Sequence, residues 1–178
     1  MVQSVELVLD GDSDAAVRAQ WQRLADVGLP SQARHTGASN RPHVTLAARQ
    51  NLPAGLDAAL ALAVGELPLP LVLGGLLCFP GRRCVLARLV VPSVGLLRAQ
   101  AGVHAVLDDA GAAPAHGDHF RGGTWTPHVT LARGLTCEQL ASAVALLATA
   151  SPDLAATAVS ARRWDGEARR TWELPVPR

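Results

Sequence analysis

The sequence contains no lysine, tyrosine or isoleucine, and every one of its sixteen basic residues is an arginine. We interpret this bias as a property of GC-rich coding DNA rather than of the protein's chemistry. The sixteen arginines face fifteen acidic residues, which leaves a formal net charge of +1. A charge this small excludes the broad positive field that holds a long nucleic acid. The partner is therefore expected to be small, or to be only the end of a polymer.

Cysteine is also scarce. Cys78, Cys84 and Cys137 form neither a CxxC motif nor a Cys/His zinc spacing, which predicts neither a disulfide framework nor a structural metal and fits a reduced, cytoplasmic location. The most apolar stretch, residues 67–79, is interrupted by prolines and glycines and is too short to span a bilayer. The N-terminus lacks the basic residues of a secretory signal. We therefore expect no association with a membrane.

What is present suffices for one hydrophobic core, because 49% of the 178 residues are hydrophobic. We predict a single domain over residues 1–178, with approximate halves 1–91 and 92–178. Hydrophobic periodicity and turn residues predict an order of strand, helix, motif strand, helix and two strands, followed by helix, motif strand, helix and two strands. The helices are expected to begin at Ser13 or Asp14, near Leu56, at Ser93 and at Thr136.

One string of six residues, Pro-His-Val-Thr-Leu-Ala, occurs at 42–47 and again at 127–132. It places His43 and His128 85 residues apart. Copies of a merely structural strand usually keep the apolar face and let the polar face change, whereas both His-x-Thr pairs are retained here. Two imidazoles on equivalent strands are what an acid–base enzyme without a metal requires, since one takes a proton and the other gives one.

Each copy is predicted to be a strand, because residues two apart share a face only when the chain is extended. Val-Thr favours a strand, and the preceding proline disfavours a helix. Strict alternation puts Ala47 and Arg49 on the same face as His43 and Thr45. Arg49 is therefore a candidate phosphate clamp.

In the second copy, alternation places His128, Thr130 and Ala132 on one face. Arg133 falls on the opposite face, and it reaches the site only if the strand ends or bulges there, as Gly134 permits. Arg133 is the second candidate phosphate clamp.

Other residues carry weaker signals. Phe79 is one of only six aromatic residues and lies beside a Pro-Gly turn, so it is a candidate for base stacking, with hairpin packing as the alternative. The run 116–119, His-Gly-Asp-His, contains metal-ligating residue types but lacks an established spacing, and no metal is predicted. His35 and His104 are expected on the surface or in packing. The arginine pairs 82–83, 162–163 and 169–170 are expected to be solvated.

The duplicated motif, at this spacing in a chain of this length, resembles the 2H phosphoesterase superfamily, which is named for its two His-x-Thr/Ser motifs. Its most similar group is the bacterial RNA 2′,3′-cyclic phosphodiesterases, also called the 2′-5′ RNA ligase family. Arg133 and the segments 77–80 and 83–86 are similar to that family as well. The resemblance covers nearly the whole chain by element order.

The resemblance implies an α+β fold of two pseudo-symmetric lobes, each an antiparallel sheet with outer helices, with the active-site groove between them. It also implies cleavage of 2′,3′-cyclic phosphates or 2′-5′ linkages without metal, ATP or any other cofactor. The expected partner is a nucleotide or RNA terminus carrying a cyclic phosphate, and a monomer is expected.

The resemblance implies hydrolysis of the cyclic phosphate to a 2′-phosphate by in-line attack, with formation of 2′-5′ linkages as the reverse of their cleavage. His43 and His128 form the acid–base pair, and Thr45 and Thr130 donate hydrogen bonds to the phosphate oxygens. The sequence leaves open which histidine is the base. Two other classes of function remain: a nucleotide-binding module of this fold with little catalysis, and a purely structural duplicated domain.

Overall fold

The structure, a computed structural model, describes residues 2–37, 39–115, 119–148 and 152–175. Within them it forms four α-helices, a short 3₁₀ helix and seven strands, in the predicted order. The elements are β1 (Gln3–Leu9), α1 (Gly11–Asp26), η1 (Gln32–Arg34), β2 (His43–Arg49), α2 (Asp57–Val64), β3 (Leu69–Phe79), β4 (Cys84–Val90), α3 (Val94–Asp109), β5 (His128–Leu135), α4 (Cys137–Ala148), β6 (Leu154–Asp165) and β7 (Arg170–Glu173). Only η1 has no counterpart in the prediction.

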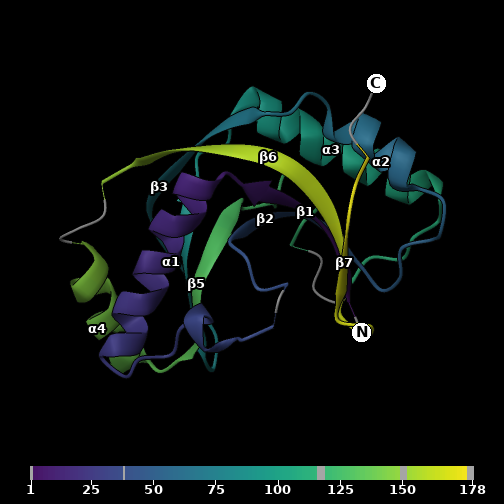
Figure 1. Cartoon of the computed structure of the whole chain (residues 1–178). Helices are drawn as coiled ribbons and strands as arrows, with labels where there is room; N and C mark the ends of the chain where they lie inside the picture. The colour runs from purple at the N-terminus through teal and green to yellow at the C-terminus, as the bar shows by residue number, and fades with distance from the viewer. Residues whose placement is uncertain (1, 38, 116–118, 149–151, 176–178) are drawn as a thin grey trace.

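All seven strands belong to one antiparallel sheet with the order β2-β1-β6-β3-β4-β5, and β7 pairs with β6. Figure 1 shows the sheet bent into an arch, with α1 and α4 at one end and α2 and α3 at the other. The α+β fold with an antiparallel sheet and outer helices is therefore confirmed, and the sheets of the two lobes are continuous through the pairing of β6 with β3. Both motif strands, β2 and β5, lie at the free edges of this sheet.

The strand order is symmetric about its centre, because β2-β1-β6 on one side corresponds to β5-β4-β3 on the other. The repeating unit is therefore β1-α1-β2-α2-β3, followed by β4-α3-β5-α4-β6. The two units meet in the hairpin turn at 80–83, whereas the sequence prediction placed the division at 91/92, beside a proline. The helices are exchanged between units: α1 packs with α4 and β5, and α3 packs with α2 and β2. This exchange leaves one common core.

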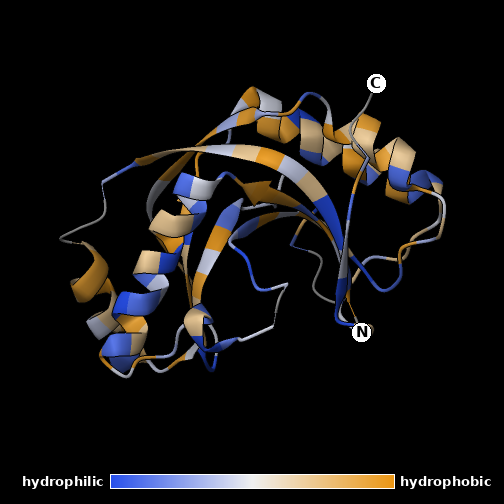
Figure 2. Cartoon of the chain, in the orientation of Figure 1, coloured by the Kyte–Doolittle hydropathy of each residue, from blue (hydrophilic) through white to orange (hydrophobic). Residues whose placement is uncertain are grey.

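Regular alternation builds that core. On β1, Val5, Leu7 and Leu9 are fully buried, and α1 presents Val17 and Leu24 to the same cluster. Figure 2 shows apolar segments along β1, β5 and β6 and on the flanking helices. Each fully buried leucine contributes about 2 kcal/mol relative to an exposed one, before the cost of ordering the chain is deducted. No helix within the described ranges is long and apolar enough to cross a membrane.

Side chains cap the beginnings of α1 and α4. The cap of α1 is Asp10, not the predicted Ser13 or Asp14: its carboxylate accepts hydrogen bonds from the Ser13 backbone N–H at 2.9 Å and the Thr157 backbone N–H at 2.8 Å. At the start of α4, the predicted capping box of Thr136 and Gln139 is present, with reciprocal hydrogen bonds of 2.9 and 3.1 Å. The Asp10 cap fixes the beginning of α1 against β6.

Candidate active site

The two motif histidines begin the two edge strands and make the same local hydrogen bond. His43 Nδ1 lies 2.6 Å from the Arg41 carbonyl oxygen, and His128 Nδ1 lies 2.8 Å from the Thr126 carbonyl oxygen. Because a carbonyl oxygen only accepts, each Nδ1 carries the proton and donates it. Each imidazole is thereby held in one orientation, with Nε2 as the nitrogen that is left for chemistry.

Two tryptophans close the open edges beside the motifs. The Trp125 indole donates to the Thr45 carbonyl oxygen at 3.2 Å, and the Trp21 indole donates to the Thr130 carbonyl oxygen at 3.0 Å. Edge strands leave such carbonyls without a ladder partner, and here a side chain supplies one. Because Trp125 precedes the second motif while Thr45 belongs to the first, its hydrogen bond joins β2 to the segment that leads into β5.

Both motif strands contain a β-bulge at the same position. In β2, Thr45 lies opposite Glu6 while Ala47 lies opposite Val5, so Leu46 is the extra residue. Residues directly opposite one another point to the same face of a sheet. The bulge therefore turns Ala47 onto the face of Val5, which packs against the helices, and ends the alternation that began at His43.

Because of this bulge, the prediction that Arg49 shares the face of His43 is wrong. Arg49 lies two residues after Ala47 and therefore points to the same face as Ala47, toward the helices. Its guanidinium is only 1% exposed, donates to Asp108 Oδ1 at 2.8 Å and contacts His104 Nδ1 at 3.1 Å. The structure therefore does not bring Arg49 to the motif histidines, because strict alternation fails at Leu46. His104, the residue expected to pack, is buried in this contact.

The equivalent bulge in β5 has the opposite consequence for Arg133. Thr130 lies opposite Ala87, and Arg133 lies opposite Val85, with the extra residues at Leu131 and at Gly134, whose φ is +79°. Arg133 consequently shares the face of His128 and Thr130. Its guanidinium is exposed and donates to Thr130 Oγ1 at 3.3 Å. The sequence prediction placed a bulge at Gly134, whereas the bulge that turns Arg133 onto this face lies earlier, at Leu131.

The second histidine lies in a partly apolar environment. Phe79, at the end of β3, packs its ring against the His128 imidazole with 4.6 Å between the ring centroids. Burial lowers the pKa of His128; its hydrogen bond to Thr126 opposes this, and the nearby charges of Arg133 and His43 lower the pKa further. At neutral pH, His128 is thus favoured as a neutral imidazole with an Nε2 lone pair.

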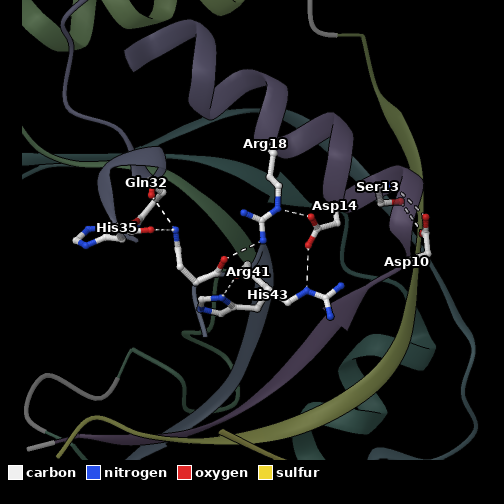
Figure 3. Close-up of polar contacts among 9 residues, drawn as sticks. Asp10, Ser13, Asp14, Arg18, Gln32, His35, Arg41 and His43 are labelled. Carbon is white, nitrogen blue, oxygen red and sulfur yellow. Dashed lines mark hydrogen bonds and ion pairs between the residues drawn. The ribbon is translucent and has the colours of Figure 1, made fainter. Parts of the chain in front are cut away.

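Hydrogen bonds and ion pairs hold the loop that leads into His43 against α1 (Figure 3). Asp14 accepts hydrogen bonds from Arg18 and Arg41, and Arg18 also donates to the Asn40 backbone carbonyl at 2.8 Å. The Asn40 amide in turn donates to the carbonyls of Gln32 and His35. These contacts hold the Arg41 carbonyl that orients His43, while the His35 side chain is exposed.

Sequence reasoning missed an ion pair beneath the first histidine. Glu6 Oε1 lies 3.7 Å from His43 Nε2, and Glu6 Oε2 accepts a hydrogen bond of 2.9 Å from Arg162 Nε. The side chains of Glu6 and Arg162 are each only 4% exposed. Arg162 is therefore buried, contrary to the prediction that the pair 162–163 is solvated. The sequence signal that could have indicated this pair is Glu6 itself, which is a lone carboxylate in the otherwise apolar run of β1.

A small cavity of about 40 Å³ is lined by His43 of the first motif, by Thr130 of the second motif and by Trp21 of α1. A larger hollow of about 480 Å³ lies between α2 and the end of β7, and no motif residue lines it. Within the part of the chain that the structure describes, no three His, Cys, Asp or Glu side chains are grouped so that they could hold a metal ion. Of the run 116–119, residues 116–118 lie outside the described residues.

Comparison with solved structures gives the same fold. The chain superposes on the protein TT0787 of Thermus thermophilus with a TM-score of 0.60 and 18% identity, covering 98% of this chain and 96% of that one. The corresponding values for E. coli LigT complexed with NADP+ are 0.55 and 19%, covering 98% and 94%, and for Kluyveromyces marxianus Usb1 with uridine monophosphate they are 0.56 and 14%, covering 98% of both chains. At these identities the likeness shows the fold alone.

Sequence comparison identifies the family. No curated protein sequence matches the chain. The family model described as the 2′-5′ RNA ligase superfamily matches residues 12–168. This range holds both His-x-Thr motifs, both edge strands and most of the common core. The protein therefore belongs to the 2′-5′ RNA ligase superfamily.

Proposed function

We propose that this protein is a metal-independent phosphodiesterase that hydrolyses 2′,3′-cyclic phosphates of nucleotides or RNA ends to 2′-phosphates. The observation that carries the proposal is the matched pair of imidazoles on the two edge strands. In His43 and His128 alike, Nδ1 is engaged by a backbone carbonyl and Nε2 is left for a substrate. Hydrolysis of a cyclic phosphodiester requires one base and one acid on opposite sides of phosphorus.

The roles follow from the surroundings of each ring. His128, whose pKa is lowered by burial, takes the proton from water as the water oxygen bonds to phosphorus. His43 gives its Nε2 proton to the ribose 3′-oxygen as the phosphorus–oxygen bond breaks. Exchange with solvent then restores both protonation states. An RNA 5′-hydroxyl in place of water gives a 2′-5′ linkage by the reverse of diester cleavage.

Charge on the phosphate is met by the other motif residues. The Thr45 and Thr130 hydroxyls donate to the non-bridging oxygens, and the Arg133 guanidinium, already in contact with Thr130, adds a positive charge. Related folds support a nucleotide substrate, because LigT has been solved with 3′-AMP and with NADP+ and Usb1 with uridine monophosphate.

The test is incubation with 2′,3′-cyclic nucleotides and identification of the position of the phosphate in the product. His43→Ala and His128→Ala should each lower turnover by two to four orders of magnitude, or about 10²- to 10⁴-fold. His35→Ala is the matched control, because its side chain is exposed and outside the proposed machinery. Wild-type turnover in a folded His128→Ala protein would contradict the proposal.

Metal independence has its own test. Dialysis against EDTA should leave the rate unchanged, because both proton transfers are assigned to imidazoles. Loss of activity that is restored by zinc or manganese would favour a metal enzyme instead.

A further inference from the structure

We propose that the buried ion pair of Glu6 and Arg162 is a positioning device that makes His43 the proton donor. This inference rests on the proposed function and deepens it. Glu6 touches no reacting atom in this scheme and acts through the imidazole beside it.

The donor and acceptor inventory around His43 supports this assignment. The Arg41 carbonyl lies at Nδ1 and the Glu6 carboxylate lies near Nε2, and both of these groups are acceptors only. A neutral imidazole has one N–H and would turn a lone pair toward one of these oxygens. An imidazolium has two N–H groups, so both oxygens face a donor when His43 carries the proton that it is to give.

The distance between Glu6 and His43 also matters. At 3.7 Å the carboxylate is beyond normal hydrogen-bond reach of Nε2, yet it is close enough for strong Coulomb attraction. The Glu6 carboxylate therefore lies beside the Nε2 proton without forming a hydrogen bond to it. Hydrogen bonds from Ser4 Oγ at 2.7 Å and Arg162 Nε at 2.9 Å hold the carboxylate in place.

Comparison of the two pseudo-symmetric units shows that the carboxylate of Glu6 has no equivalent in the second unit. Glu6 lies opposite Thr45 in the first unit, and Ala87 occupies the equivalent place opposite Thr130 in the second. Among the residues that the structure describes, a carboxylate forms an ion pair with His43 and none does so with His128. Arg133 shows the reverse asymmetry, because it lies on the His128 side. The two units share a scaffold, but the Glu6 carboxylate lies beside His43 whereas the Arg133 guanidinium acts on His128.

Other titratable groups near His43 come from its own loop and from the elements around it. Arg41 is adjacent in sequence, but its guanidinium pairs with Asp14. His128, on the opposite edge strand, interacts electrostatically with His43. His104 reaches β2 from α3, and it contacts the Leu46 carbonyl. Neither Arg41 nor either histidine supplies the negative charge that Glu6 does.

The experiment compares Glu6→Gln with Arg162→Gln, which break the same buried pair from opposite sides. The rate constant kcat/KM for a 2′,3′-cyclic nucleotide is measured against pH. In Glu6→Gln the basic limb, where the acid loses its proton, should move to lower pH by about one unit. In Arg162→Gln it should move to higher pH, because Glu6 is then left without its counter-charge. The acidic limb should stay in place in both.

Structural damage would not produce this pattern. Each single variant leaves one buried charge unpaired, so damage would lower activity in both variants instead of moving their basic limbs in opposite directions. Glu6→Asp retains the charge and should keep the basic limb near the wild-type position. If the Glu6→Gln protein fails to fold, the double variant Glu6→Gln/Arg162→Gln is used in its place, because it leaves no unpaired buried charge. The basic limb of the double variant should lie at lower pH than that of Arg162→Gln. Limbs that stay in place, or that move in the same direction in the two single variants, overturn the proposal.

A readout without turnover separates this inference from the proposed function. The imidazole proton signal of His43, identified by its absence in a His43→Gln protein, is titrated by NMR in the wild-type and variant proteins. If the wild-type protein cleaves no cyclic phosphate, the proposed function fails and the titration alone decides the inference. Opposite movements of the His43 midpoint support it, and equal or absent movements overturn it.

Discussion

The indole of Trp125 donates a hydrogen bond of 3.2 Å to the backbone carbonyl of Thr45, and this bond connects β2 to the segment that leads into β5. Trp21 makes the corresponding bond from α1 to Thr130. The two edges of the sheet are therefore held by side chains at the places where a ladder partner is missing. We expect the relative position of the two imidazoles to depend on these contacts, because β2 and β5 do not pair with each other.

Trp125→Phe should lower the free energy of unfolding by about 1–2 kcal/mol, because the partly buried Thr45 carbonyl loses its donor while most of the apolar contact is kept. It should also lower kcat about tenfold, because small misplacement of catalytic groups is costly. Urea denaturation and kinetics measure the two effects. Trp172→Phe is the matched control, since Trp172 is 40% exposed and lies on β7. Equal effects in the two variants would contradict the role given to Trp125.

Arg133→Ala should lower kcat/KM by about 10- to 100-fold while the protein stays folded, because its guanidinium is exposed and points to the motif threonine. Its positive charge also lowers the pKa of His128, so the variant should raise that pKa. The acidic limb of the rate profile should then move to higher pH. An unchanged profile with an unchanged rate would remove Arg133 from the site.

Arg49→Ala should show the opposite division between stability and activity. Its guanidinium is buried against α3 and paired with Asp108, so its loss should cost about 2 kcal/mol of unfolding free energy and leave the pH profile as it was. Urea denaturation and the profile of the folded fraction measure this. A large fall in kcat/KM without loss of stability would show that Arg49 serves the phosphate after all.

The comparison of these two arginines shows where sequence reasoning stops. Element order, the motif strands and the capping box at Thr136 follow from periodicity and turn residues, which are local. The bulges at Leu46 and Leu131 do not, because Leu-Ala after each His-x-Thr suits either face of a half-buried strand. One extra residue reverses every later side chain. The burial of Arg162 was similarly hidden, since its partner Glu6 lies far away in the sequence and pairing of distant strands brings the two together.

Asp10→Ala should lower the free energy of unfolding by about 1–2 kcal/mol, because Asp10 caps α1 and also accepts the Thr157 backbone N–H of β6. The hydrogen bond from the Ser13 hydroxyl is the largest cause that lowers the pKa of Asp10. A carboxyl with a lowered folded pKa contributes stability above its unfolded pKa and loses it as pH falls. The difference between Asp10→Ala and wild type should therefore shrink in acid. Asp12→Ala, in the exposed first turn, is the control, and thermal unfolding at several pH values checks both.

Phe79→Ala should raise the pKa of His128 toward its ordinary value, because burial is the largest cause that lowers it and the Phe79 ring covers the imidazole. Phe79→Leu keeps an apolar cover and should preserve most of the shift. The imidazole signal of His128, titrated by NMR, measures the change. An unchanged His128 titration in Phe79→Ala would show that the ring does not provide the burial.

The sign of the functional effect follows from the role of His128 as base. If the pKa of His128 is higher, the base becomes protonated at a higher pH, so the acidic limb of kcat/KM should move to higher pH and activity should be lost mainly below neutral pH.

The free energy of unfolding should depend on pH through the same histidine. In the wild-type protein, the unfolded chain with a histidine pKa of about 6.5 binds protons that the folded state refuses, so stability falls as pH drops below that value toward the lowered folded pKa. In Phe79→Ala the folded and unfolded values lie closer together, and urea denaturation at pH 5 and pH 8 should show a smaller difference between the two than in the wild-type protein.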